Sequence, residues 1–413
     1  MSRLLHTSDW HLGHTLHGHP RSEDFDAVLA EIVAIAQESR PDLIVHSGDL
    51  FHSSRPTPRD LMRAMRILAE LAAVAPTVVV AGNHDSPTWF EFFDLMAGPS
   101  VGRGLFFVGR YRPAHEGGVF TFDACGGEER IRLAALPFVH PNRFWQRSAS
   151  DTSYGEYAEG MRELQAGLVG AMREGYDPDR DVLFFTAHVY VTGATRSRSE
   201  RAMGESFEIA VEDLPEVSYT ALGHIHLPQA VRSSTLTARY AGSPLAMDFS
   251  EANDPKGVVI VDAEPGRPVR VRTRRLSSGR RLAKFEGTLD QLRAEAAEYD
   301  GTFLKPLITG EEPDVPLRQK IAEIVPRALI IKPALAREAA TNAVLDFNPG
   351  DEPDLPDAFH AYLAREGLSG AAAESAVTAF SQLLNEADEE TPPPVPAEEL
   401  LRAALEDTWT EAS

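Results

Sequence analysis

Five short apolar runs, each followed by polar side chains that can bind a metal ion, constrain the fold of this chain more than any other feature. The runs lie at residues 3–6, 42–46, 77–81, 182–186 and 218–222. Their aliphatic and β-branched composition predicts strands that are buried on both faces. Segments with helical spacing at residues 25–38 and 59–73 separate the early runs. Such alternation of strand and helix predicts a layered α/β fold.

The polar residues that follow the five runs predict a metal site. They are Asp9 and His11, Asp49, Asn83 and His84, His188, and finally His224 and His226. Loops at the carboxyl ends of strands in α/β folds converge on one region, which is where ligands bind. Each residue alone is an ordinary turn residue, but turns favour Asn, Asp, Gly and Ser and do not account for repeated His. The set as a whole is therefore typical of a metal centre.

The chemistry of this ligand set favours two transition-metal ions. Imidazole, carboxylate and amide ligands without sulfur suit Mn, Fe or Zn better than Mg or Ca. The single cysteine, Cys125, excludes a thiolate cluster within the chain. Asp49 stands alone after the second run, so its carboxylate is the candidate bridge between two ions, which about 3.5–4 Å apart can activate water and neutralise a phosphate group. We therefore expect two divalent metal ions, with Mn²⁺ as the leading candidate.

Length and composition predict more than one domain. A chain of 413 residues that is 43% hydrophobic exceeds the size at which single cores stop growing. Residues 1–275 contain the five runs and are expected to form the catalytic domain. Strand and helix patterns at residues 276–335 predict a small separate α/β domain, and we expect this domain to cap the catalytic domain and to bind DNA. Residues 336–413 are rich in Pro and in acidic residues, and we expect an acidic linker with helices that dock a partner.

The charge of the chain is unevenly distributed. Its formal net charge of −22 argues against DNA binding, because affinity for phosphates comes mainly from Lys and Arg. Residues 351–413, however, carry 2 basic against 15 acidic residues, which is more than half of the excess. Two basic clusters remain as candidate DNA contacts: Arg196, Arg198 and Arg201, and eight Lys and Arg residues between 267 and 284. The second cluster also fits an edge strand protected by charge.

The start of the chain and its hydropathy predict a cytoplasmic protein. The chain begins MSRLLHTSDWHLG, which lacks the apolar segment of a secretory signal. A run of about 18 apolar residues occurs nowhere in the sequence, so we expect no membrane partner.

Five motifs occur in a recognisable order: DxH, GD, GNHD, a lone His and GHxH. This order resembles the calcineurin-like metallophosphoesterases. The segments HTSDWHLG, GDLFHSSRPTP, VVAGNHDSP, TAHVYVTGA and YTALGHIHLPQ are similar to the SbcD branch of that family, the nuclease subunits of bacterial SbcCD complexes. The likeness is strong over residues 1–275 and weaker beyond. It implies a layered β-sandwich core flanked by helices, with a small α/β capping domain and a helical C-terminal tail.

The resemblance also implies a role for each candidate residue. It places Asp9, His11, Asp49 and His226 on one ion, and Asp49, Asn83, His188 and His224 on the other. It leaves His84 without a metal, beside the scissile phosphate, where an imidazole can stabilise the transition state or protonate the leaving oxygen. His52 matches a family position that contacts the phosphate. We therefore expect His84, Asp49 and His52 to be catalytic.

The same resemblance implies a substrate and partners. It predicts a DNA double-strand exonuclease and a hairpin or single-strand endonuclease that acts in DNA repair, replication and recombination and is associated with the nucleoid. The implied partner is an SMC-like ATPase of the SbcC type, in a heterotetramer. Helices from residues 355–387 are expected either to dock this partner or to pack on the chain's own second domain. Their apolar side chains form two stripes: Leu355, Phe359, Tyr362 and Leu363, and Val377, Phe380, Leu383 and Leu384. The aromatic run at residues 89–96 fits an ordinary core helix, and the resemblance implies a helix that helps to form a homodimer.

Two alternatives stay open, because one kind of metal centre serves many substrates. The chain would be a phosphoesterase for small nucleotides or phosphoproteins, or mainly a DNA-end scaffold whose metals are structural. GDLFHSS and GNHD differ from the GDxxDRG and GNHE of the Ser/Thr phosphatases, which disfavours a phosphoprotein substrate.

Overall fold

A computed structural model divides the chain into two units, Met1–Ala339 and Ala340–Ser413. It describes residues 1–97, 104–140, 154–197, 208–309, 317–331 and 334–335, together with short helical pieces between 359 and 380. None of the helices in these ranges combines the length and the hydropathy that a bilayer-spanning segment requires.

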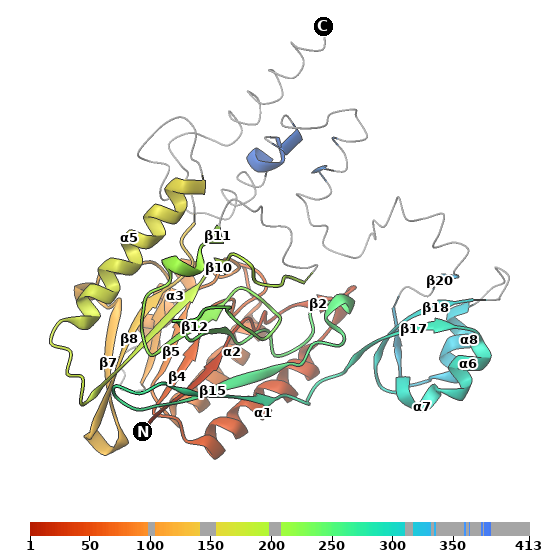
Figure 1. Ribbon diagram of the computed structural model, residues 1–413. Helices are drawn as coiled ribbons and strands as arrows, with labels where there is room; N and C mark the ends of the chain where they lie inside the picture. The colour runs from red at the N-terminus through yellow and green to blue at the C-terminus, as the bar shows by residue number, and fades with distance from the viewer. Residues whose placement is uncertain are drawn as a thin grey trace, which may run out of the picture. The chain divides into compact units, whose positions relative to one another are not determined.

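Two six-stranded sheets form the centre of the first unit (Figure 1). In spatial order the first contains β16 (Arg270–Arg275), β15 (Gly257–Ala263), β1 (Ser2–Thr7), β4 (Leu43–His46), β5 (Thr77–Val80) and β6 (Leu105–Val108). The second contains β13 (Gln229–Ala230), β14 (Ala238–Tyr240), β12 (Tyr219–Gly223), β9 (Asp181–His188), β8 (Glu129–Leu136) and β7 (Val119–Ala124). β1, β4 and β5 run parallel to one another, and so do β9 and β12. All five predicted strands therefore end at a shared edge within their own sheet.

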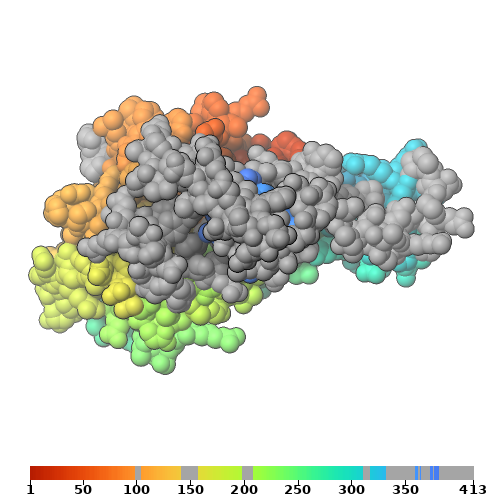
Figure 2. Space-filling view, turned by 90° about the horizontal axis from the view of Figure 1, so that it is seen from above, coloured from red at the N-terminus to blue at the C-terminus, as the bar shows by residue number. Residues whose placement is uncertain are grey.

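Helices cover the outer face of each sheet. α1 (Ser22–Ser39), α2 (Pro58–Ala72) and α3 (Pro87–Ala97) pack on the first sheet, and α5 (Tyr154–Arg173) packs on the second. In Figure 2 the orange segments that contain α2 and α3 and the yellow segment of α5 lie on opposite sides. α2 begins as the sequence predicts, because Pro58 is its first residue and the Thr57 side chain accepts a hydrogen bond from the Asp60 N–H.

Alternation within single strands explains this layering. Val78 and Val80 of β5 face the core between the two sheets, whereas Val79 packs under the helices. Phe184 and Phe185 of β9 divide in the same way. Because successive side chains of a strand point to opposite faces, a continuously apolar strand needs cover on both of them. The predicted layered α/β fold is confirmed.

Residues 99–140 contain short apolar runs separated by Gly and Pro, a pattern that predicts antiparallel strands. That prediction is only partly correct. β7 and β8 are antiparallel, but β6 pairs parallel with β5, and β8 pairs parallel with β9. α3 precedes β6 and α5 precedes β9. A helical crossover returns the chain in the same direction, which a tight hairpin cannot do. The short Gly- and Pro-punctuated runs resemble hairpins in sequence because the crossover helices lie outside them.

A small parallel sheet with its own helices follows β16. It consists of β17 (Leu282–Gly287), α6 (Leu289–Ala294), α7 (Ala296–Tyr299), β18 (Phe303–Ile308), α8 (Leu317–Ile324), β19 (Leu329–Ile330) and β20 (Ala334–Leu335). Leu292, Leu304 and Ile321 belong to a core between this sheet and its helices. A separate cluster joins the sheet to two residues of the larger part, Leu16 and Phe249. The boundaries at residues 275 and 335 stay predictions.

The described pieces of the second unit contain a small apolar cluster of their own. Leu363, Ala373 and Ala376 are buried, and the rings of Phe359 and Phe380 lie 4.4 Å apart. Phe359 and Phe380 were expected to belong to two separate docking stripes, and they contact each other instead. Most other residues of the predicted docking segment lie outside the described residues.

Candidate metal centre

The structure brings the residues that follow the five strands together at the edge where the two sheets meet. Asp9 and His11 follow β1, Asp49 follows β4, Asn83 and His84 follow β5, His188 ends β9, and His224 and His226 follow β12. The His224 N–H donates to Asp9 Oδ1 at 2.9 Å, which links the second sheet to the first. His188 Nδ1 lies 2.9 Å from the carbonyl oxygen of Ser47, which makes a second link.

The backbone at these positions is strained. Asp9, His11, Asp49 and His224 have φ values of 52°, 48°, 54° and 104°. Side-chain-bearing residues rarely adopt this left-handed region, and strained backbone of this kind clusters at functional sites. The turns direct these four side chains toward one another rather than along the strands.

Two glycines allow the loops to approach each other closely. A Cβ added at Gly82 would lie 2.1 Å from Asp49 Oδ1, and one added at Gly48 would lie 2.2 Å from His188 Nδ1. Gly48 also has a φ of 105°, which glycine adopts without strain. Both motifs, SGD and GNHD, therefore need glycine for space, and SGD needs it for the turn as well.

The ligand-type atoms form two groups that we name by one member each. The Asp9 cluster consists of Asp9, His11 and His226, and the His188 cluster consists of Asp49, His188 and His224; in each, the candidate ligand atoms lie within 4.8 Å of one another. Asn83 joins the His188 cluster, because its Oδ1 lies 3.0 Å from His188 Nε2 and 2.9 Å from His224 Nδ1. All six residues of the two clusters are buried or nearly so.

Asp49, a member of the His188 cluster, also faces the Asp9 cluster. Its Oδ2 is 3.5 Å from His11 Nε2 on one side and 3.4 Å from His188 Nε2 on the other. Its Oδ1 accepts a hydrogen bond from the His84 N–H at 2.9 Å. One carboxylate oxygen therefore faces both groups, as a bridging ligand requires.

The electrostatics of the His188 cluster fit a cation. Burial acts to lower the pKa of His188, but the carboxylates of Asp49 and Asp9 raise it to about 9. Burial acts to raise the pKa of Asp49, yet the charges of His188 and His84 hold it well below its usual range. The metal-free protein thus keeps a proton on His188, whose ring nitrogens lie near three oxygens: Ser47 O, Asn83 Oδ1 and Asp49 Oδ2. A metal ion would take the place of that proton.

The Asp9 cluster fits a cation as well. Asp9 Oδ2 and His11 Nδ1 are buried and lack a hydrogen-bond partner, which is costly for groups that water cannot reach. Burial raises the pKa of Asp9 to about 7 and lowers that of His11. His11 Nε2 and His226 Nε2 face each other at 3.0 Å. Oxygen and imidazole ligands without sulfur are suited to a divalent transition-metal ion.

A third group consists of His11, His52 and His84, and it shares His11 with the Asp9 cluster. The rings of His84 and His52 stack with centroids 5.7 Å apart, and the centroid of His84 is 4.8 Å from that of His11. His84 Nδ1 lies 3.0 Å from the carbonyl oxygen of His52, so a neutral ring donates there and leaves Nε2 as an acceptor. Burial lowers the pKa of His52 to about 4. The structure thus places both expected catalytic histidines next to the candidate metal ligands.

Asp85 holds two of the loops together. Its Oδ2 accepts from the N–H groups of Gly82 and Leu50, and its Oδ1 accepts from the N–H of Phe51. Burial and the charge of Asp49 raise its pKa to about 7. Asp85 therefore fixes the β4 loop against the β5 loop. Its place in the GNHD motif fits a turn residue and an orienting group equally well, so the sequence alone did not decide its role.

Two supporting residues were not predicted from the sequence. Glu251 lies fully buried, with Oε1 3.0 Å from His226 Nδ1. The Ser47 hydroxyl bonds His6 Nε2 at 2.8 Å and Thr186 Oγ1 at 3.0 Å between the sheets. Ser47 belongs to the SGD motif, which was the one available signal for it. Glu251 gives no local signal, because it lies 25 residues from its partner.

Several arginines of the two basic clusters form ion pairs within the chain, which makes them less available to contact DNA than the sequence suggests. Arg196 pairs with Glu208 and stacks on Tyr190, 3.5 Å from the ring centroid; Arg198 and Arg201 lie outside the described residues. In the second cluster, Arg272 and Arg274 pair with acidic residues, as do Arg267 and Arg280. Within the described chain, much of this positive charge is therefore neutralised internally.

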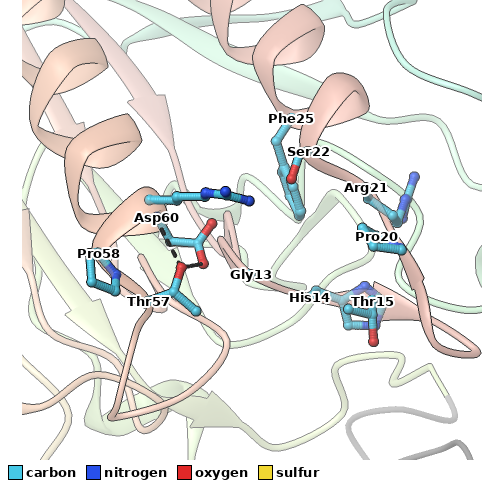
Figure 3. A pocket seen from close by; sticks show the side chains of 11 residues that line it. Gly13, His14, Thr15, Pro20, Arg21, Ser22, Phe25, Thr57, Pro58 and Asp60 are labelled. Carbon is cyan, nitrogen blue, oxygen red and sulfur yellow. Dashed lines mark hydrogen bonds between the residues drawn. The ribbon is translucent and has the colours of Figure 1, made fainter.

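A cavity of about 490 Å³ lies beside the three histidines, between the first turns of α1 and α2 (Figure 3). His14 lines it, and the His14 ring packs edge-on against His52 with centroids 4.8 Å apart. Thr57 donates to Asp60 at the far wall. His17, from the same loop, stacks on Phe249. A loop position alone predicts a histidine without partners, and for His14 and His17 that prediction is wrong.

The chain belongs to the calcineurin-like phosphoesterases, whose family model matches residues 2–228. The family predicted from the five motifs is therefore confirmed, and with it an enzyme that hydrolyses phosphate esters.

Curated relatives are similar over most of the chain and carry the SbcD name that the motifs suggested. The SbcD subunit of the nuclease SbcCD from Bacillus subtilis is 32% identical over 69% of this chain and 72% of its own length. The corresponding subunits from Staphylococcus saprophyticus and Escherichia coli K12 are each 26% identical, over 84% and 74% of this chain and 86% and 76% of their own lengths. The resemblance to the SbcD branch is thus confirmed.

Proposed function

We propose that this chain is the nuclease component of a heteromeric DNA-processing enzyme and hydrolyses phosphodiester bonds with two divalent cations, Mn²⁺ foremost. The single observation that carries the two-metal part is Asp49 Oδ2, which lies 3.5 Å and 3.4 Å from one histidine of each cluster. The relatives, which are named as parts of a nuclease, support a nucleic acid as the substrate, and we propose that it is DNA.

The residues divide the work by position. Asp9, His11, Asp49 and His226 would hold one cation, and Asp49, Asn83, His188 and His224 the other. Cations held there would neutralise the phosphate and lower the pKa of water. His84 stands outside both sets with its Nδ1 turned to the His52 carbonyl, so Nε2 is left to donate or accept a proton at the substrate.

The surroundings of the centre suit a polymeric substrate. The cavity lined by His14 adjoins the histidine group and offers room beside it. Four of the eight basic residues between 267 and 284 pair with acidic residues of this chain, which weakens their hold on DNA phosphates, so we expect a second protein to supply much of the grip on DNA. We propose an SbcC-type ATPase in that role, in a heterotetramer built on a homodimer of this chain.

A nuclease assay of the full chain tests the proposal. With Mn²⁺, the purified protein should shorten duplex DNA from its ends and open hairpins, faster when the ATPase partner and ATP are present. Asp49→Ala should lower the cleavage rate by on the order of 10³-fold or more, because the variant loses a ligand shared by both ions.

Matched controls separate the alternatives. Asp262→Ala removes a buried aspartate that pairs with Arg3 and Arg272 in the first sheet, and it should leave the rate per folded molecule near that of the wild type. Equal cleavage by Asp49→Ala would disprove the mechanism. Hydrolysis of small phosphodiesters with no DNA cut under any condition would favour the small-substrate alternative.

A further inference from the structure

Glu251 is the only acidic side chain among the described residues with hydrogen bonds both to a candidate metal ligand and to a buried lysine. Its side chain is fully buried. Oε1 lies 3.0 Å from His226 Nδ1, and Oε2 lies 2.8 Å from Lys256 Nζ and accepts from the Met247 N–H at 3.0 Å. Both carboxylate oxygens are therefore engaged, and the group has one orientation.

Lys256 extends this support to the backbone of the ligand. Its ammonium donates to the carbonyl oxygen of His226 at 3.0 Å and to Ser243 Oγ at 2.9 Å. The Ser243 N–H donates to the same carbonyl at 3.1 Å. His226 is thus held at its ring by Glu251 and at its main chain by Lys256 and Ser243.

The bond from His226 Nδ1 to a carboxylate determines which ring nitrogen faces the metal position. A carboxylate accepts the Nδ1 proton, so the neutral ring carries its lone pair on Nε2, which points at His11 Nε2 3.0 Å away. Partners of this kind fix the tautomer and the orientation of metal-binding histidines in proteins. The His188 ring is oriented by a backbone carbonyl instead.

Glu251 also lies next to the contact with the small sheet. It ends the short 3₁₀ turn Phe249–Glu251, which Asp248 caps by accepting the Ser250 and Glu251 N–H groups. Phe249 packs in one cluster with Leu282, Phe303 and Ile331 of the small sheet and with Leu16. Phe249, which the small sheet covers, is therefore two residues before Glu251, whose carboxylate holds His226.

We propose that Glu251 is a positioning residue that sets the affinity of the Asp9 cluster for its metal ion, and that the small sheet maintains it through Phe249. This inference rests on the proposed metal centre but not on the DNA substrate. It predicts that the Asp9 cluster alone, and not the His188 cluster, depends on residues 249–256 and on the small sheet.

Metal titration of the full chain tests this inference without any nuclease assay. Mn²⁺ is titrated into the metal-free protein by calorimetry, and the wild type should show two binding steps. Because a largely buried lysine left without its partner is destabilising, the variants carry Lys256→Met as well. Lys256→Met alone is the reference for them, since Lys256 also donates to the His226 carbonyl. Glu251→Ala with Lys256→Met should weaken one step by about 10–100-fold and leave the other unchanged.

Glu251→Gln with Lys256→Met is the conservative rescue. Glutamine has the same length and offers an acceptor oxygen to His226 Nδ1, so it should restore most of the lost affinity. Phe249→Ala should weaken the same step by a smaller factor. Asp181→Asn is the matched control, because it disturbs a buried carboxylate paired with Arg130 at the opposite end of β9, and both of its binding steps should match the wild type.

The outcomes separate a positioning role from a merely structural one. If the alanine variant binds both ions like the wild type, or if both steps weaken together with a fall in the unfolding temperature of the metal-free protein, the inference is wrong. A wild type that binds two ions but cuts no DNA contradicts the proposed substrate and leaves the inference standing. A wild type without two binding steps overturns the metal centre and this inference with it.

Discussion

The Asp9 cluster and the His188 cluster use the same kinds of side chain but are supported by different parts of the chain. The His188 ring is held by the carbonyl of Ser47, whose hydroxyl lies in a buried network with His6 and Thr186 between the sheets. The His226 ring is held by Glu251, from a short turn outside both sheets. Support that belongs to the core is fixed once the sheets pack. Support from a peripheral turn can change while the core stays folded.

The largest expected effect is on the nuclease rate, and it distinguishes His84 from the residues of the two clusters. His84→Asn should lower the nuclease rate by about 10²–10⁴-fold, because it removes general acid or base assistance at the substrate. Both Mn²⁺ binding steps should remain, since His84 belongs to neither cluster. The check is a cleavage time course and a calorimetric titration on the same preparation. Loss of a binding step would show that His84 is a metal ligand and belongs to one of the two clusters.

The core-side support predicts a stability effect of intermediate size. Ser47→Ala removes the hydroxyl that bonds His6 and Thr186, and a buried partner left unsatisfied costs about 1–3 kcal/mol of unfolding free energy. Denaturant unfolding in the presence of a chelator measures it. Ser234→Ala, at an exposed position of a loop, should change the unfolding free energy by less than about 0.5 kcal/mol. Equal stability of the two variants would show that the network between the sheets does not hold the His188 side.

The smallest expected effect is a pH dependence of the metal-free protein. The pKa of His188 is raised from 6.5 to about 9, so its protonation contributes stability that is full below pH 6.5 and is lost as the pH rises through 9. The unfolding free energy in chelator should fall between pH 7 and pH 9 by on the order of 1 kcal/mol. Thermal unfolding across this range measures the change.

A variant and an added ion sharpen this prediction. His188→Asn should flatten the fall, and saturating Mn²⁺ should reverse it, because the ion competes with the proton. A metal-free wild type whose stability rises over the same range would contradict the assignment of that proton to His188.

The strand ends were predictable from sequence because strand and ligand are local to each other. A buried apolar run that leads directly to His or Asp predicts both a strand and a candidate ligand at the end of that strand. His188, the last residue of β9, is an example. Parallel pairing then brings such ends together at one edge. The layered fold followed from the same continuous apolar runs, which need cover on both faces.

Features that depend on distant contacts could not be predicted. Glu251 is recognised only once the turn that carries it packs beside His226, and no local periodicity marks it. The positive φ of His11 and His224 is likewise imposed by the assembled loops, because nothing in a histidine favours that conformation over an ordinary turn. The ion pairs of Arg272 and Arg274 could be predicted only with the knowledge that β15 and α1 lie beside β16.

The central claim is that Asp49 joins the two clusters into one centre for two metal ions. The most direct measurement is the number of Mn²⁺ ions bound by the full chain, determined by calorimetry and by elemental analysis after buffer exchange, for the wild type and Asp49→Ala. Two ions in the wild type, with both steps weakened in Asp49→Ala, is the result this account predicts. A single ion in the wild type, or a variant that loses only one step and keeps the other at full affinity, would contradict a shared ligand.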